Sequence, residues 1–141
     1  MRILTVILLI VLLSSCTTYL IPKSSLVEQL GSIDSTQLVN RRVIGPVATQ
    51  YEYLANPITT IRCVDKNGQS QTLVNSPSIE MRVTETDNKK TIFYFDRTLI
   101  QNGQLIGVRS RFAPFVDKQI DLEDIQVIEI QDGQKNFKYA K

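Results

Sequence analysis

The clearest pattern along the chain is an alternation of apolar and polar residues that is typical of β-strands. Ile79, Met81 and Val83 alternate with polar side chains, so the three apolar side chains share one face of a predicted strand. Residues 92–95 are instead apolar throughout, which predicts a central strand buried on both faces. Beyond residue 41, short runs of this kind are separated by Asn, Gly, Asp and Pro, and this texture favours an all-β fold.

Turn residues between these runs predict hairpins. Asn67-Gly68 and Asn102-Gly103 are pairs that tolerate the positive φ angles of tight turns, and residues 86–89 form a third predicted turn. Gly107 permits a bend or bulge within its strand. The predicted strands are residues 58–64, 71–74, 79–84, 91–99, 105–112, 119–122, 125–130 and 137–139.

Strands at this spacing, without a long amphipathic helix, predict an antiparallel meander that curls into a small open barrel or sandwich. Residues 79–130 resemble the small open β-barrels of Sm-like proteins, in which a strongly bent five-strand meander ends in a polar turn and a strand, as in residues 120–125. This resemblance implies a fold and no catalytic residue, because folds of this size host many functions.

The first sixteen residues follow a different pattern. Arg2 precedes residues 3–13, where ten of eleven positions are apolar, and Leu13-Ser14-Ser15-Cys16 closes the segment. The apolar run fits the roughly 7–15 residues of a signal-peptide core and falls short of the ~20 that span a bilayer. This arrangement resembles the precursors of bacterial lipoproteins, whose lipobox is a branched apolar residue, two small residues and a cysteine.

The lipoprotein resemblance implies that the thiol of Cys16 takes a diacylglyceryl group and that residues 1–15 are removed as a signal peptide. Two or three acyl chains would then attach the protein stably to a membrane, whereas a single chain holds it only marginally. The residue directly after Cys16 is Thr17 and not an aspartate. In this respect the chain resembles lipoproteins that are delivered to the outer membrane, facing the periplasm. The alternative is an ordinary secretory signal with Cys16 near the cleavage point by chance.

These features divide the chain into a signal peptide (1–15), a lipid-anchored tether (16–40) and a β domain (41–141). Within the tether, Ser25 and Glu28 have the spacing of a capping box for a short helix that would end at Gly31. A disordered spacer is the alternative, because isolated short helices are unstable in water.

The mature part also resembles small lipoproteins of the Bacteroidota in residues 93–96, 110–112 and 130–133. That likeness, too, implies no catalytic residue.

Composition narrows the candidate chemistry. Removing residues 1–15 leaves 126 residues, enough for one domain, and lowers the formal net charge from +2 to +1. A charge so near neutral argues against a nucleic-acid partner. Cys63 is the single other cysteine and the chain has no histidine, so we expect no intramolecular disulfide, no zinc site and no cofactor.

Three groups of side chains are candidate sites. Arg109 and Arg111 lie two apart on a predicted strand, so they project from one face and could bind phosphate or carboxylate groups; ordinary surface cations are the alternative. Cys63 is predicted to be a buried structural thiol, with an intermolecular or redox-active thiol as the alternative. The acidic residues 121–124 are predicted to form a solvated turn, because calcium requires more oxygen ligands at defined spacing.

Two hypotheses for function remain. The first is a non-catalytic lipoprotein of the cell envelope that binds another envelope protein or a cell-wall component. The second is an envelope hydrolase or lipid-modifying enzyme with a serine or aspartate nucleophile. Because the chain lacks histidine, the usual general base is missing, and the sequence favours the first hypothesis.

Overall fold

The computed structural model describes residues 17–109 and 117–141. In chain order, the helices and strands of this part are β1 (Tyr19–Leu20), α2 (Lys23–Leu30), η1 (Ser35–Gln37), β2 (Val39–Ile44), η2 (Pro46–Ala48), β3 (Gln50–Ala55), β4 (Thr60–Val64), β5 (Ser70–Val74), β6 (Ile79–Glu85), β7 (Lys90–Tyr94), η3 (Phe95–Arg97), β8 (Thr98–Gln101), β9 (Gln104–Val108), β10 (Asp117–Asp121), η4 (Leu122–Asp124), β11 (Ile125–Asp132) and β12 (Lys138–Tyr139), where η marks a 3-10 helix.

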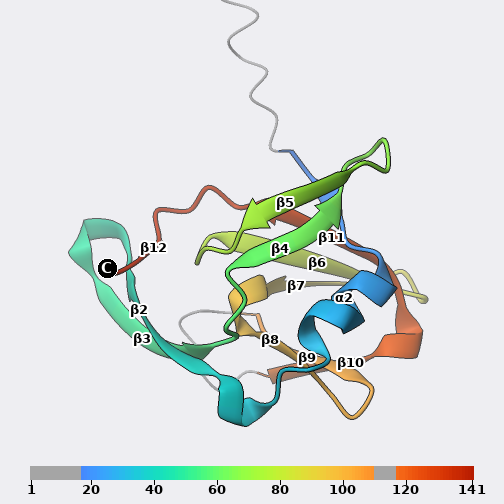
Figure 1. The fold of residues 1–141 in the computed structure, drawn as a ribbon, viewed down its shortest axis with the longest axis horizontal. Coiled ribbons are helices and arrows are strands. Elements are labelled where there is room, and N and C mark those ends of the chain that lie inside the picture. Colours follow the sequence, from blue (N-terminus) through green and yellow to red (C-terminus); the bar gives the residue numbers. More distant parts are fainter. Residues whose placement is uncertain (1–16, 110–116) are drawn as a thin grey trace, which may run out of the picture.

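The core lies between two layers. One layer is a six-stranded antiparallel sheet in the order β5-β4-β1-β11-β6-β7, and the other is formed by α2 and the three-stranded sheet β10-β9-β8 (Figure 1). Leu26 and Leu30 from α2 pack into the same cluster as Ile61 and Ile130 from the large sheet and Leu105 from the small one. Because no hydrogen-bonded ladder between described residues joins the sheets, the fold is an open, sandwich-like all-β architecture, as the sequence predicted.

The described residues between 79 and 132 form six antiparallel strands, where the sequence resemblance over 79–130 implied a bent meander of five. The chain runs through β6 and β7, turns at η3 into β8, β9 and β10, and returns through η4 to β11, which pairs with β6. The apolar positions of β6 are buried and its alternate positions are more exposed through Arg82, as the period-two pattern predicted. Asn88 and Gly103 adopt positive φ angles in the predicted turns.

One predicted strand is wrong in its position. Residues 92–95 were predicted to be central and buried on both faces, yet β7 is an edge strand of the large sheet. Phe93 and Phe95 are fully buried, while Ile92 on the other face is 45% exposed. The prediction of burial on both faces failed because a single exposed apolar residue is common on a solvent-facing sheet.

The predicted tether is also wrong, because residues 19–30 belong to the fold. Tyr19–Leu20 forms β1 in the middle of the large sheet, between β4 and β11. The α2 helix exists, which overturns the disordered spacer, and it ends at Gly31 as predicted. The capping box does not form, since Pro22 is the N-cap and Ser25 lies inside the helix. A two-residue strand has no detectable periodicity, so the sequence pattern could not reveal β1.

Gly107 has a role other than the predicted bulge. Its pairing with Thr98 and Lys118 is regular on both sides of β9. A Cβ atom at this position would lie 2.4 Å from Cδ1 of Phe93. The glycine therefore allows the backbone of β9 to lie directly against the buried Phe93 ring.

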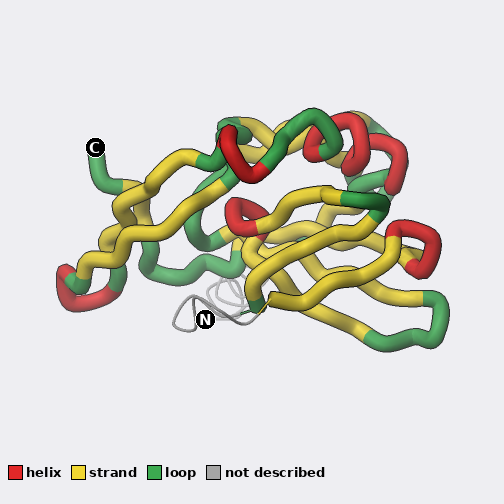
Figure 2. The backbone as a smooth tube through the Cα atoms, turned by 90° about the horizontal axis from the view of Figure 1, so that it is seen from below, coloured by secondary structure: helices red, strands yellow, loops and turns green. Residues whose placement is uncertain are grey.

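The third sheet, in the order β12-β2-β3, forms an arm beside the two-layered body. Figure 2 shows the β2–β3 hairpin extending away from the other strands. At its tip, Val47 and Ala48 have φ angles of 59° and 57°, and Val47 is 99% exposed. Positive φ is strained for a β-branched residue, so the tip holds an apolar side chain in solvent at an energetic cost.

Candidate functional site

The first candidate site is the end of the large sheet at which the described chain begins, around the start of the central strand β1. The hydroxyl of Thr18 donates a hydrogen bond to Oε1 of Gln131 at 3.2 Å, and Tyr19 pairs with Ile130. The backbone N–H of Ile21 then bonds to the carbonyl of Ile128 at 2.9 Å. The chain is therefore fixed to the sheet from residue 18 onward.

Lys23, at the start of α2, extends this attachment to η4. Its ammonium group donates to the backbone carbonyls of Leu122 and Ile125 at 3.0 and 3.1 Å. These carbonyls flank the 3-10 turn that leads into β11. The N-terminal segment thus bonds to both ends of this turn as well as to the strand beside it.

An open groove of about 620 Å³ surrounds this chain start. Its lining residues come mainly from the start of β1 and from the β4–β5 turn, two segments whose course is drawn in Figure 1. Its lining combines aromatic, aliphatic, amide and charged side chains: Thr17, Thr18, Tyr19, Leu20, Asp65, Lys66, Asn67, Gln71 and Glu129.

The β4–β5 turn presents a fixed negative charge and a nearby cation to this groove. The carboxylate of Asp65 accepts hydrogen bonds from the backbone N–H groups of Gln69 at 3.0 Å and Asn67 at 2.8 Å. The bond from Gln69 is the largest cause that lowers the pKa of Asp65 below its usual value. Lys66 is exposed in the same turn, so charges of both signs lie at this end of the sheet.

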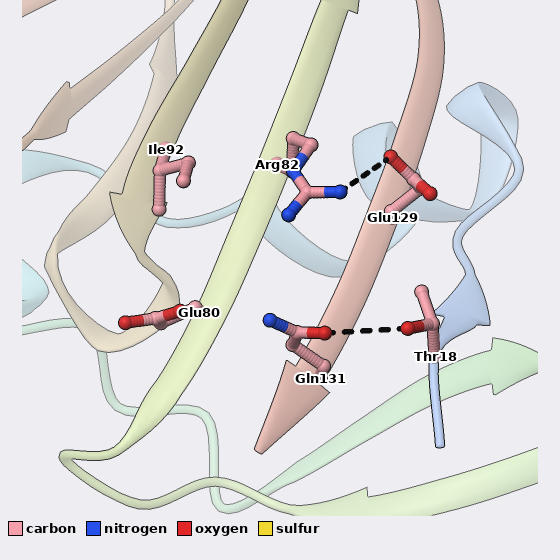
Figure 3. A pocket seen from close by; sticks show the side chains of 6 residues that line it. All are labelled: Thr18, Glu80, Arg82, Ile92, Glu129 and Gln131. Carbon is pink, nitrogen blue, oxygen red and sulfur yellow. Dashed lines mark hydrogen bonds and ion pairs between the residues drawn. The ribbon is translucent and has the colours of Figure 1, made fainter. Parts of the chain in front are cut away.

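The outer face of the large sheet is occupied by paired polar side chains. Arg82 forms an ion pair with Glu129 at 3.6 Å, next to the bond between Thr18 and Gln131 (Figure 3). The pit between these side chains measures only about 10 Å³. That volume accommodates about one water molecule, so this face does not form a substrate pocket.

A second cluster, which the sequence analysis missed, joins the arm to the body. The fully buried carboxylate of Asp96 accepts hydrogen bonds from the hydroxyls of Tyr53 on β3 and Tyr139 on β12, at 2.5 and 2.9 Å. The guanidinium groups of Arg97 and Arg41 lie 4.7 and 5.1 Å from the ring centroids of Tyr53 and Tyr139, respectively. We call these five residues the clasp.

The clasp is a structural rather than a reactive arrangement. Burial raises the pKa of Tyr139 well above its usual value, and the negative charge of Asp96 adds to the effect. The hydroxyl therefore stays protonated and remains a hydrogen-bond donor at neutral pH. No sequence motif indicates the cluster, because each tyrosine lies 43 residues from Asp96 in the chain.

Two predicted site residues lie outside the described residues, namely Cys16 and Arg111. Arg109 is exposed directly after β9. The predicted anion site at Arg109 and Arg111 therefore stays a prediction.

Cys63 is buried, as predicted, and its Sγ donates a weak hydrogen bond to the carbonyl of Gln71 at 3.6 Å. Burial raises the pKa of this thiol, which disfavours the reactive thiolate.

The acidic segment 121–124 forms the solvated turn that was predicted. Asp121, Glu123 and Asp124 are exposed around η4, and the Asp121 carboxylate accepts a hydrogen bond from Gln104 at 2.7 Å. Over residues 17–109 and 117–141, His, Cys, Asp and Glu side chains form no group of three that could hold a metal ion. None of the helices in these two segments has the length and apolar character of a membrane span.

No protein-family model, curated protein or solved structure matches this chain.

Proposed function

We propose that this protein is a lipoprotein of the bacterial cell envelope, anchored through a lipid on Cys16 and acting as a non-catalytic binding or structural module. The membrane it occupies is the outer membrane, with the β domain facing the periplasm. Its partner there is an envelope protein or a cell-wall component.

The observation that carries the proposal is the position of the first strand relative to the lipobox. The apolar segment 3–13 and the lipobox end at Cys16, and β1 begins at Tyr19. Cleavage before Cys16 would leave every helix and strand of the described chain intact. Processing before Cys16 is therefore compatible with the fold of the described residues, whose first strand begins three residues later.

The described surface supports a binding role over catalysis. The larger grooves are open and lie at the surface, whereas enzyme pockets bury most of their ligand among converging polar groups. Two of them flank β12, with volumes of about 330 and 460 Å³. The second of these contains Val47, the strained and exposed tip of the arm.

Replacing Cys16 tests the anchor directly. In cells, Cys16→Ala should block both lipidation and normal cleavage, so the protein should accumulate as a longer precursor. The matched control is Cys63→Ala, which removes the other thiol and should leave processing and membrane attachment unchanged. Normal cleavage and release of Cys16→Ala into the soluble fraction, or loss of attachment in the control alone, would contradict the proposal.

A further inference from the structure

The link between the anchoring residue and the folded sheet is very short. Thr17 is the only residue between Cys16 and Thr18, which already bonds to Gln131. Two extended peptide steps span at most about 7 Å. A lipid on Cys16 would therefore hold this end of the sheet within a few ångströms of the bilayer surface.

The start of the chain is held firmly to this end of the domain. Tyr19 and Leu20 pair with Ile130 and Glu129 on one side, and Leu20 pairs with Val64 on the other. The domain could then turn only about the few bonds of Cys16 and Thr17, which keeps this end of the sheet nearest to the lipid. The element next to the chain start, the β4–β5 turn with Lys66 and Asn67, would then also lie close to the membrane.

We infer that this end of the domain, formed by residues 17–20 and the β4–β5 turn, lies directly against the phospholipid headgroups. The inference rests on the proposed lipid anchor and adds an orientation to it. In Figure 1 the membrane would lie beyond the chain start at the top, and the β8–β9 turn at the bottom would point away from it.

The side chains around the 620 Å³ groove fit a headgroup layer. Lys66 supplies a cation for phosphate, and the carboxylate of Asp65 supplies a negative charge for ammonium groups. Leu20, which is 40% exposed beside the same groove, supplies an apolar side chain to this end of the domain. Because both signs of charge are present, zwitterionic lipid suffices and anionic lipid is not required.

This orientation limits where a partner can be. A compact domain of 125 residues has a radius of gyration of about 14 Å, so its far side would lie only about 35–40 Å from the bilayer. The arm and the body would both stay within that layer. The partner therefore has to reach the membrane surface itself, which favours a membrane-bound or membrane-proximal protein.

The absence of tryptophan from the chain allows a direct test with single-tryptophan variants of the lipidated protein. Asn67→Trp places the probe in the β4–β5 turn, and Gln101→Trp places it at the end of β8, where the side chain is also exposed. Each variant is reconstituted in phosphatidylcholine vesicles in which a fraction of the lipids carries a nitroxide on the headgroup, which quenches nearby tryptophan fluorescence. We expect quenching for Asn67→Trp and none above the solvent background for Gln101→Trp.

Two further variants make the result decisive. Ile92→Trp, on the outer sheet face, should be quenched less than Asn67→Trp; stronger quenching there would mean that the sheet lies flat on the membrane and would overturn the inference. Ten Gly and Ser residues inserted between Cys16 and Thr17 add a link of about 17 Å and should abolish the quenching of Asn67→Trp. Quenching that survives the insertion would show docking that does not depend on the short link.

Mass spectrometry of the same vesicle-bound samples separates the two proposals. If Cys16 carries the lipid and Asn67→Trp is not quenched, the orientation is wrong and the anchor stands. If Cys16 carries no lipid, the anchor fails and the orientation fails with it.

Discussion

The body and the arm of this molecule are held together by different forces. The body encloses fully buried apolar side chains such as Phe93 and Phe95, whereas the arm contributes only Val43 and Ala55 to the fully buried apolar set. The arm is instead attached by the clasp, in which two tyrosine hydroxyls donate to the Asp96 carboxylate. Apolar burial is spread over many contacts, while a clasp depends on a few directional bonds. Single changes should therefore weaken the whole body but release the arm locally.

The largest effect should follow from removing a core ring. Phe93→Ala should lower the free energy of unfolding by about 3–5 kcal/mol, because the lost burial is compounded by the cavity that remains. Denaturant unfolding at equilibrium measures this change. Ile92→Ala, one residue away on the exposed face, is the matched control and should cost much less; equal losses would mean that Phe93 is not a core residue.

A smaller and local effect is expected from the clasp. Tyr139→Phe removes a hydrogen bond to a charged group, worth about 1.5–3 kcal/mol, so amide exchange in β12 and β2 should become about ten- to a hundred-fold faster. Exchange in β6 and β11 should not change. Tyr19→Phe is the control, since the Tyr19 hydroxyl makes no hydrogen bond to a described residue. Equal acceleration in body and arm would show that the two unfold as one unit.

Overfilling the core tests the close contact between β9 and Phe93. Gly107→Ala should destabilise the body by about 1–3 kcal/mol, because the new Cβ has no space beside a buried ring. Adding Phe93→Leu should recover part of that loss, since the smaller side chain can yield. Independent, additive losses in the double variant would contradict this account of the glycine.

Alkaline pH should destabilise the arm before it destabilises the body, and by less than the substitutions above. The folded-state pKa of Tyr139 is raised above its unfolded value of about 10, so the stabilisation from the protonated hydroxyl is complete below that pH and is lost as pH rises through the folded pKa. Protection of the arm amides, corrected for the base-catalysed exchange rate of an unfolded chain, should therefore fall above about pH 10, before protection in the body falls. This loss of protection should be absent in Tyr139→Phe, and its persistence there would assign it to another group.

The smallest effect concerns the tip of the arm, where a substitution should stabilise the fold and not destabilise it. Val47→Gly should stabilise the hairpin by about 1 kcal/mol or less, because glycine adopts a positive φ without strain but loses more chain entropy on folding. Thermal unfolding of the arm, followed by amide exchange, measures it. A destabilising result would mean that the exposed valine contributes packing that the structure does not show.

The sequence predicted those parts of the fold in which local pattern and tertiary environment agree. β6 alternates along its length and lies inside the sheet, and the Asn67-Gly68 turn has the positive φ at Gly68 that its composition suggests. The tether failed as a prediction because β1 is too short for any periodicity, and its place in the sheet is set by β4 and β11. The edge position of β7 likewise depends on pairing rather than on its own residues.

The candidate sites also divide into those that local sequence predicts and those that only the folded chain reveals. Burial of Cys63 could be predicted, because a thiol without a histidine partner in the chain is most often structural. The clasp could not, because its members come from η3, β2, β3 and β12 and meet only after the chain has folded. The proposed lipobox is a local sequence pattern, so the sequence alone can suggest it, whereas the short link between Cys16 and the sheet required the structure.

We propose that this β-fold is attached to the envelope membrane through Cys16, and intact mass spectrometry of the protein extracted from native membranes is the sharpest test of that attachment. We expect a mature chain that begins at Cys16 and carries the added mass of a diacylglyceryl group, with or without a third acyl chain. A mature amino terminus with an unmodified cysteine sulfur, or a chain that retains residues 1–15, would contradict it.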